Sequence, residues 1–331
     1  MALTTDQMAL VEKDMYKVSR ESYKEDALVY PKIFKVVNGV KGGGDKFTQL
    51  LGAHDIKEHE TENEDIDFHS PVQGWQALVK YRTFSDGVNF SKNAVEDNIR
   101  NGEIGKTLKG YAGTWGSAIR NKKETFAANI LNYGGYTSGD AIYNNAWGNE
   151  ADAAGDLIYD TQSLFGLTGD GHTTKGGDEY YNAISSGALS PTTFQTLYVL
   201  VSDTNAYSEQ DRRIENKPDT LLTKDGADAL MAKRICLSNN LPGGELNDTN
   251  IYKGLVNPIS WGYLDGTGWY ILKAKCDELQ WHERQKPVIE FFRRQENRGY
   301  RASVDTRWGV LIKPGIWRKI ARTGGSYSAT K

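Results

Sequence analysis

The sequence predicts a fold that mixes helices and strands. Three observations support this prediction. Residues 76–84 have strand character, residues 102–133 repeat their apolar side chains with a helical period, and the tail from 288 to 312 alternates between apolar and polar positions. A chain of 331 residues is also long enough to bury a large core and to hold two lobes.

The composition is that of an ordinary globular protein, with 38% apolar and 25% charged residues. The 35 glycines against 8 prolines favour many turns and bent strands over disorder. The two cysteines, Cys236 and Cys276, lack the close spacing of a zinc site or a disulfide framework. We therefore expect two reduced, buried thiols and no metal or cofactor.

Nothing in the sequence predicts an association with a membrane. No apolar run approaches the roughly 20 residues that a membrane-spanning helix needs. The first residues lack a basic segment followed by an apolar one, so we expect no signal peptide.

Charge is distributed unevenly along the chain, although the net charge is only −3. Residues 282–331 hold 12 Lys and Arg against 4 Asp and Glu, which leaves an acidic surplus in the rest of the chain. Seven acidic side chains against Lys57 lie between His54 and Asp67: Asp55, Glu58, Glu60, Glu62, Glu64, Asp65 and Asp67. Such a run is either a solvated face or one half of a contact between subunits, with the basic C-terminal part as the other half.

Residues 4 to about 30 read as a helix, because Met8, Val11, Met15 and Val18 recur every three or four positions. This charged segment suits an arm that lies on a neighbouring molecule. A strand-like segment follows at 31–40 and is broken by three glycines at 42–44.

From 45 to about 86 two strand-like stretches flank the acidic run, which predicts an extended hairpin. An isolated hairpin is marginally stable and needs a partner surface. The next stretch, 102–133, predicts a helix of about thirty residues or roughly 45 Å, ended by two glycines at 134–135. Gly110, Gly113 and Gly116 lie inside it and allow either close packing or a bend.

Residues 134–189 are rich in loop-forming residues. A helix start follows at Ser190-Pro191, a short strand at 218–222, and another helix from about 224 to 235. Two further strands, 255–261 and 269–274, read as a hairpin or a bulged turn.

Several motifs in this order resemble one protein family. They are Tyr159-Asp160 before Leu164-Phe165 and His172, then Leu189-Ser190, and then the strand Pro218-Asp219-Thr220-Leu221-Leu222. The tail adds Pro287 and the run from Arg301 through Asp305 to Arg307-Trp308-Gly309. The chain resembles tailed-bacteriophage major capsid proteins of the Mu-like group from about 45 to 317. Thr161 departs from the family pattern, where glycine is usual, and residues 134–156 look inserted.

The resemblance implies an α+β architecture, the Hong-Kong-97-type capsid fold. It implies an N-terminal arm at 1–44, an E-loop hairpin at 45–90, and a peripheral domain with a spine helix and the inserted loop at 91–185. An axial domain would follow at 186–285, and return strands of the peripheral domain with a C-terminal tail at 286–331.

The resemblance also implies a function without catalysis. Copies would assemble through hexamers and pentamers into an icosahedral phage head that encloses double-stranded DNA without reading its sequence. Portal, scaffold and cement proteins would be further partners, with assembly in the host bacterial cytoplasm. The residues that we expect at contacts between subunits are Asp55, Glu58, Glu60, Glu62, Glu64, Asp65, Trp75, Arg293, Arg294, Arg298 and Arg301.

Two other functions stay open at this point. An encapsulin-like nanocompartment has the same fold but encloses a cargo enzyme, and a soluble carbohydrate-active enzyme would use the abundant aromatic residues. Chemical signatures are weak: His54 and His59 are wrongly spaced for one helix face, and Cys276 near His282 lacks a nucleophile motif. No phosphate-binding glycine loop is present, and no lysine–asparagine pair is singled out for covalent crosslinking. The basic tail is either a nucleic-acid stacking surface or a strand lobe that faces neighbouring subunits.

Overall fold

A computed structural model of the chain separates into two compact units, which we describe one at a time. The structure describes residues 5–24, 27–41, 44–51, 58, 68, 70, 72–93, 103–135, 163–169, 171–185, 187–240, 249–265, 268–293 and 299–323. Unit 1 comprises Met1–Gly43, Lys80–Ile130 and Gln280–Val310, and unit 2 comprises Gly44–Val79, Leu131–Leu279 and Leu311–Lys331.

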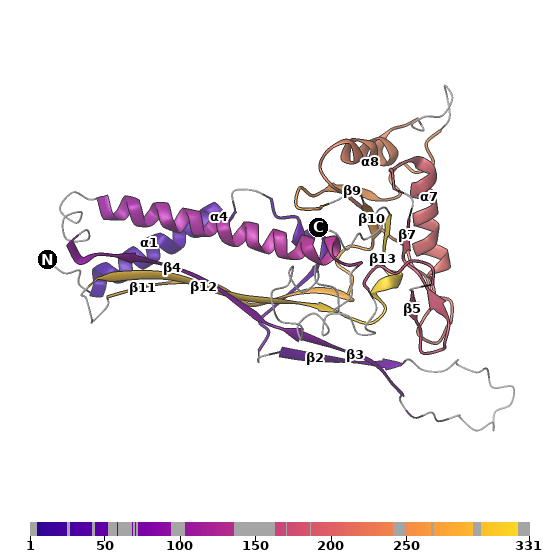
Figure 1. Cartoon of the computed structure of the whole chain (residues 1–331), viewed down its shortest axis with the longest axis horizontal. Helices are drawn as coiled ribbons and strands as arrows, with labels where there is room; N and C mark the ends of the chain where they lie inside the picture. The colour runs from indigo at the N-terminus through magenta and orange to yellow at the C-terminus, as the bar shows by residue number, and fades with distance from the viewer. Residues whose placement is uncertain are drawn as a thin grey trace. The chain divides into compact units, whose positions relative to one another are not determined.

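Unit 1 is a four-stranded sheet with helices along it (Figure 1). The strand order is β1-β11-β12-β4, in which β1 runs parallel to β11 and β4 antiparallel to β12. Its elements are α1 (Thr5–Tyr23), α2 (Tyr30–Ile33), β1 (Lys35–Asn38), β4 (Arg82–Phe90), α4 (Glu103–Asn132), β11 (Leu279–Arg293) and β12 (Tyr300–Ile312). The few end residues of α4, β11 and β12 beyond the unit's limits belong to unit 2.

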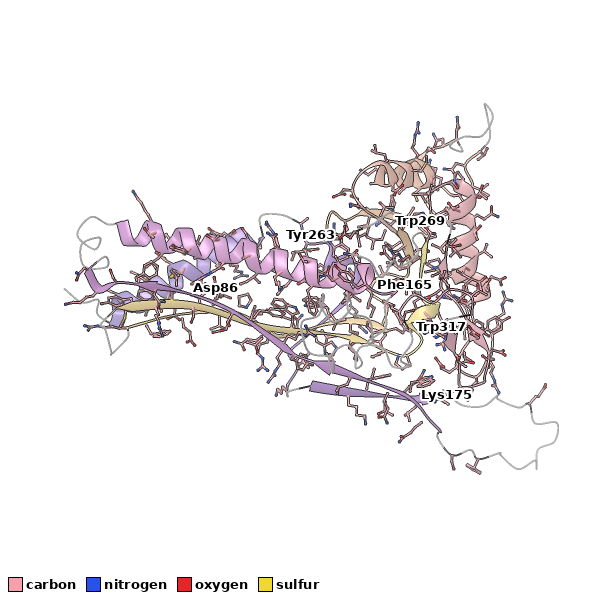
Figure 2. All side chains as sticks on the ribbon, in the orientation of Figure 1. Asp86, Phe165, Lys175, Tyr263, Trp269 and Trp317 are labelled. Carbon is pink, nitrogen blue, oxygen red and sulfur yellow. The ribbon has the colours of Figure 1, made fainter. Side chains whose placement is uncertain are left out.

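The core of unit 1 joins α1 and α4 to the long strands. Leu108, Ala112 and Trp115 of α4 pack with Ile289 and Phe291 of β11 and with the inward side chains of β12. The indole of Trp115 also donates a 2.7 Å hydrogen bond to the Asp86 carboxylate on β4, which lies beneath the long helix (Figure 2). The long helix predicted for 102–133 is confirmed as α4. Of its regularly spaced apolar residues, Leu108, Trp115 and Ile119 lie in this core, whereas Tyr111 is 43% exposed.

The first helix packs on the core of its own chain. Met15 is fully buried there, and Met8, Val11 and Val18 lie against the same cluster. The predicted apolar face of this helix is therefore confirmed, but that face is covered by α4 instead of a neighbouring molecule.

Gly116 explains how closely these two helices approach each other. A Cβ atom on Gly116 would lie 2.3 Å from the Ser19 carbonyl oxygen and 3.0 Å from the Tyr23 amide nitrogen. A Cβ on Gly110 would meet nothing within 4 Å. Close packing is thus the role of Gly116, because only a residue without a side chain allows the α1 backbone this near.

Unit 2 contains a five-stranded sheet of order β7-β13-β10-β8-β9 and two smaller two-stranded pairs, β2 with β3 and β5 with β6. The strands are β2 (Gly44–Leu51), β3 (Val72–Lys80, whose last residue belongs to unit 1), β5 (His172–Thr173), β6 (Glu179–Tyr180), β7 (Ala183–Ile184), β8 (Thr220–Thr223), β9 (Asn257–Ser260), β10 (Trp269–Leu272) and β13 (Ile320–Thr323). The helices are α7 (Pro191–Val199), the π-helical turn η1 (Leu200–Thr204), α8 (Ala227–Leu237) and the 3-10 turn η2 (Ile316–Arg318).

The core of unit 2 lies where α7 and α8 pack against this sheet. Phe194, Leu197 and Ile235 from the helices meet Leu221, Trp269 and Ile271 from the strands. The helix start predicted at Ser190-Pro191 is confirmed. The Ser190 hydroxyl accepts from the Thr193 amide at 3.2 Å, and the Thr193 hydroxyl accepts from the Ser190 amide at 2.9 Å.

Two expectations about strands were wrong. The strands near 255–261 and 269–274 do not form a hairpin, because β8 lies between β9 and β10 and pairs with both. Buried Leu221 and Leu222 make β8 an apolar central strand, a non-local pairing that turn residues do not reveal. The expected strand at 31–40 begins only at Lys35. Pro31 starts the short helix α2 instead, a position that its fixed φ favours.

Candidate interaction surfaces

Four of the eleven predicted contact residues lie in the described part of the chain: Glu58, Trp75, Arg293 and Arg301. The others lie outside the described residues: Asp55, Glu60, Glu62, Glu64, Asp65, Arg294 and Arg298. The same holds for His54 and His59 and for the inserted stretch 134–156 beyond Gly135.

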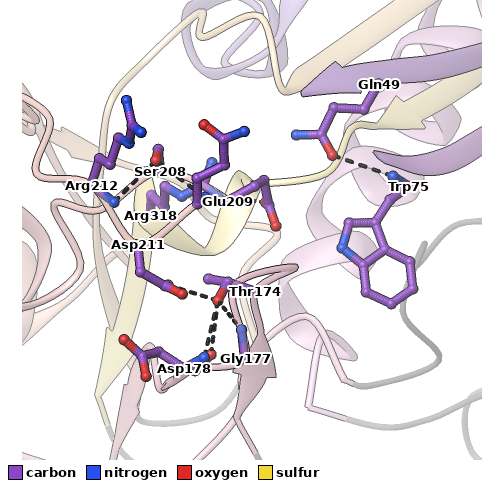
Figure 3. Close-up of polar contacts among 11 residues, drawn as sticks. Gln49, Trp75, Thr174, Gly177, Asp178, Ser208, Glu209, Asp211, Arg212 and Arg318 are labelled. Carbon is purple, nitrogen blue, oxygen red and sulfur yellow. Dashed lines mark hydrogen bonds and ion pairs between the residues drawn. The ribbon is translucent and has the colours of Figure 1, made fainter. Parts of the chain in front are cut away.

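Trp75 is a half-buried side chain on β3, and its ring is covered from within unit 2. The ammonium of Lys175 lies 3.6 Å from the centre of the Trp75 ring, which is cation–π geometry. The Trp75 amide donates a 3.4 Å hydrogen bond to the Gln49 side chain on the paired strand β2 (Figure 3). Lys175 thus ties the β2–β3 pair to the loop between β5 and β6.

The loop that carries Lys175 is held by a polar network (Figure 3). The Thr174 hydroxyl donates to the Asp211 carboxylate at 2.7 Å and accepts from the amides of Gly177 and Asp178 at 3.2 Å each. Gly177 has φ +109°, a conformation that other residues rarely adopt. The loop therefore presents Lys175 from a defined position, and sequence reasoning did not single out any of these residues.

A buried ion pair supports the same region. Arg318 donates to the Glu209 carboxylate at 2.5 Å, and both side chains are at least nine-tenths buried. The Glu209 carbonyl accepts from the Gly176 amide at 3.0 Å, so the pair is joined to the Lys175 loop. Losing one partner of such a pair is costly because it leaves the other charge buried and unpaired.

Arg293 and Arg301 lie at one end of the unit 1 sheet, at the last residue of β11 and the second residue of β12. Arg293 is exposed, whereas the Arg301 guanidinium donates a 2.6 Å hydrogen bond to the Asn89 side chain on the paired strand β4. Arg301 thus already has a partner inside its own subunit.

Apolar side chains form a second kind of exposed surface in unit 2. On α8, Leu230 is 65% and Leu237 is 59% exposed, and in the turn that follows Ile251 is 74% exposed. Asn250 holds that turn against the helix, since its side chain donates to the Ile235 carbonyl at 2.7 Å. In the sequence, this exposed apolar surface could have been recognised from two leucines seven residues apart on one helix, because that spacing places them on the same face.

The two cysteines and the two histidines of the described ranges, His172 and His282, are buried. Burial raises the pKa of the Cys276 thiol to about 12 and that of the Cys236 thiol to about 11, which suppresses the reactive thiolate. His282 lies within hydrogen-bond distance of the Tyr81 hydroxyl and the Gln280 side chain, at 3.1 and 2.9 Å. His172, the first residue of β5, is buried, stacks on Trp317 and lies 3.3 Å from the Leu164 carbonyl oxygen.

Within the described ranges, no three His, Cys, Asp or Glu side chains are grouped so that they would hold a metal ion. No helix in the described part of the chain combines the length and the apolar character needed to cross a membrane.

Comparisons with solved structures identify the fold of this chain. No protein-family model matches the sequence, and no curated protein matches it. A solved structure from Mycobacterium phage Patience is 12% identical, covers 99% of this chain and 92% of its own, and has a TM-score of 0.51. The capsid structure of cyanophage P-SCSP1u is 9% identical over 91% of this chain and 89% of its own, with a TM-score of 0.50. A virus-like particle from Pyrococcus furiosus is 9% identical over 94% of this chain and 98% of its own, also at 0.50.

At these identities the likeness concerns the fold. The chain has the predicted α+β fold of the Hong-Kong-97 type, and the match extends over nearly its whole length.

Proposed function

We propose that this chain is a major capsid protein. Its copies assemble through hexamers and pentamers into an icosahedral phage head shell that encloses double-stranded DNA. The observation that carries the proposal is the whole-length fold likeness to a cyanophage capsid structure and to a structure from a mycobacteriophage. Because the match covers 91% and 99% of this chain, it spans both units and not just one common motif.

Exposed apolar side chains on a single copy support the proposal. Leu230, Leu237 and Ile251 are each more than half exposed, and covering such groups is favourable when subunits associate. Shell assembly repeats the same contact around symmetry axes, so a neighbouring copy covers the same apolar patch on every subunit. Portal, scaffold and cement proteins belong to the proposal as partners, and the virion capsid as the location, with assembly in the host bacterial cytoplasm.

The contact residues expected from the sequence belong to the same proposal. Glu58 and Arg293 are exposed and accessible to a neighbouring subunit. Trp75 and Arg301 already have partners inside their own chain. To contact a neighbouring subunit, each would have to use the part of its side chain that is still exposed or exchange its present partner.

The alternative is an encapsulin-like shell that holds a protein cargo instead of phage DNA. The likeness to a virus-like particle favours it, since that match covers 98% of the particle's own chain at a TM-score of 0.50. For the third function, a soluble carbohydrate-active enzyme, no observation in the described part of the chain adds support to the abundance of aromatic residues.

The test is size-exclusion chromatography and negative-stain microscopy of the purified chain, expressed alone and with the neighbouring genes. Closed shells, or hexamers and pentamers, are expected. Nuclease-protected DNA inside particles would distinguish the phage head, whereas a co-purifying cargo protein would favour the encapsulin-like shell. A stable monomer of about 37 kDa under all conditions would contradict both shell functions.

A further inference from the structure

Helix α1 has a second face that its packing in unit 1 does not use. Basic side chains recur at spacings of four, three and four residues on that face, at Lys13, Lys17, Arg20 and Lys24, just beyond the last helical residue. All four are exposed. Since a helix advances about 100° per residue, this row lies opposite the buried row that contains Met15.

Two adjoining hollows follow the basic face of α1, and they share Tyr16, Arg20 and Lys24. The larger, of about 610 Å³, runs along the outer side of α1. The smaller, of about 310 Å³, extends toward α4 and β11, where Lys286 adds a fifth exposed basic side chain. We call Lys13, Lys17, Arg20, Lys24 and Lys286, with the two hollows, the basic groove.

The groove has a positive surplus. Six basic and three acidic side chains line the two hollows, which leaves three positive charges in excess. Two of the acids are already paired: Asp14 with Lys109 at 3.1 Å, and Glu283 with the buried Lys123 at 2.8 Å. The exposed basic row therefore faces solvent with little acidic counter-charge from the groove itself.

We propose that the basic groove binds the acidic run, residues 54–67, of a second copy of this chain. The proposal rests on the assembly of subunits proposed above. Its occupant has the required charge, with seven acidic residues against one lysine in fourteen positions. Glu58, the member of the run that the structure describes, is exposed.

The spacing of the two charge rows supports this pairing. Glu58, Glu60, Glu62 and Glu64 occupy alternate positions, so in an extended bound segment they share one side at steps of about 6.7 Å. The basic residues of α1 follow one another at steps of about 4.5 to 6 Å along the helix axis. Flexible lysine and arginine side chains bridge the remaining difference.

An acidic peptide fits the groove better than nucleic acid does. Leu10 and Tyr16 line the larger hollow and expose apolar surface, at 62% and 43%. The acidic run offers matching apolar groups at Ile56 and Ile66, whereas the phosphate backbone of a duplex offers none. The acid that also lines the groove, Glu21, would repel a continuous row of phosphates.

The test uses charge reversal on both sides of the contact in the full-length chain. The groove variant is Lys17→Glu with Arg20→Glu, and the run variant is Glu60→Lys with Glu62→Lys. We expect each to raise the protein concentration needed for assembly at least about tenfold, which is about 1.4 kcal/mol. The matched control, Lys106→Glu with Lys233→Glu, makes the same charge change at exposed sites outside the groove and should stay within about threefold of wild type.

Rescue separates this contact from general effects of charge. A chain with all four reversals should assemble like wild type, and an equimolar mixture of the two variants should form capsomers although neither does so alone. Rescue in the mixture requires that the groove and the run come from different copies. Assembly of wild type should also weaken with added salt, because the paired side chains are exposed.

Three outcomes would overturn the inference while leaving the shell function intact: normal assembly of both variants, loss of assembly without rescue in the four-reversal chain, or rescue in that chain but not in the mixture. Normal shells of the groove variant that lack nuclease-protected DNA would assign the groove to nucleic acid instead. Failure of the wild-type chain to assemble would contradict the proposed function itself, so the two failures are distinguishable.

Discussion

At the scale of single residues, Gly116 limits the distance between two helices of unit 1. We expect Gly116→Ala to destabilise the subunit by about 1–3 kcal/mol, because the new methyl group would lie 2.3 Å from the Ser19 carbonyl oxygen. This cost exceeds the gain of about 1 kcal/mol that alanine brings to a helix interior. Denaturant unfolding of the unassembled subunit measures the difference.

Gly110 supplies the matched control, since it lies on the same helix with open space around it. Gly110→Ala should stabilise the subunit by up to about 1 kcal/mol. Equal stabilisation by both substitutions would show that α1 and α4 do not approach each other as closely as described.

Asn182 joins three segments of unit 2 from a fully buried position. Its side-chain oxygen accepts from the Gly166 amide at 2.9 Å, and its nitrogen donates to the carbonyls of Leu164 and Ile320 at 2.9 and 3.2 Å. In Asn182→Asp the carboxylate cannot donate, so we expect a loss of about 3 kcal/mol or more in unfolding free energy. The exposed Asn239→Asp makes the same chemical change and should cost less than about 0.5 kcal/mol. Similar melting temperatures of the two variants would contradict this role.

The two thiols give a prediction that depends on pH. Burial raises the pKa of Cys276 to about 12 and that of Cys236 to about 11, above the value of about 8.5 for an unfolded thiol. The folded chain therefore holds these protons more tightly, and their contribution to stability is complete below about pH 8.5 and is lost as the pH rises toward 11 and 12. At pH 8 we expect iodoacetamide to modify both thiols readily after unfolding and only slowly before it, as measured by mass spectrometry. Rapid modification of the native subunit would show that the thiols are accessible.

At the scale of elements, α4 anchors the segment that follows α1. The buried Glu124 carboxylate accepts from the Val29 amide at 2.7 Å and from the Tyr30 amide at 3.4 Å. We expect Glu124→Ala to cost about 2–3 kcal/mol and to increase hydrogen exchange at residues 29–34, because the amides lose a charged acceptor. Glu124→Gln keeps an acceptor and should cost less. Unchanged exchange in the alanine variant would mean that α2 is held in some other way.

The sequence predicted those elements whose signals are local. The helix expected at 102–133 spans Glu103–Asn132, since its apolar period and its terminal glycines need no information from elsewhere. The wrong hairpin at 255–274 arose because β8, more than thirty residues earlier, inserts between the two strands. Which strands pair depends on distant chain segments, and turn residues carry no signal for that.

At the scale of the whole molecule, the sequence identified charged surfaces better than their partners. It singled out Trp75 but did not reveal that Lys175, a hundred residues later, covers its ring. It identified the apolar row of α1 but described the rest of that helix only as charged, and the burial of Met15 in the unit 1 core shows that the basic row faces outward. Contacts within a chain and contacts between copies use the same residue types, so composition does not separate them.

The exposed leucines of α8 provide a test of assembly at this scale. Leu230 and Leu237 are 65% and 59% exposed, so replacing both with glutamate removes little buried surface from the subunit itself. If neighbouring copies cover these side chains, each buried leucine contributes about 1.5–3 kcal/mol to the contact, and the charged variant also has to desolvate two carboxylates. We therefore expect Leu230→Glu with Leu237→Glu to unfold like wild type in denaturant but to remain unassembled at concentrations where wild type forms shells. Leu197 on α7, which is fully buried, gives the opposite pattern: Leu197→Ala should lower subunit stability by about 2–5 kcal/mol. Shells of the α8 variant that form as readily as those of wild type would show that this surface faces solvent in the assembled particle.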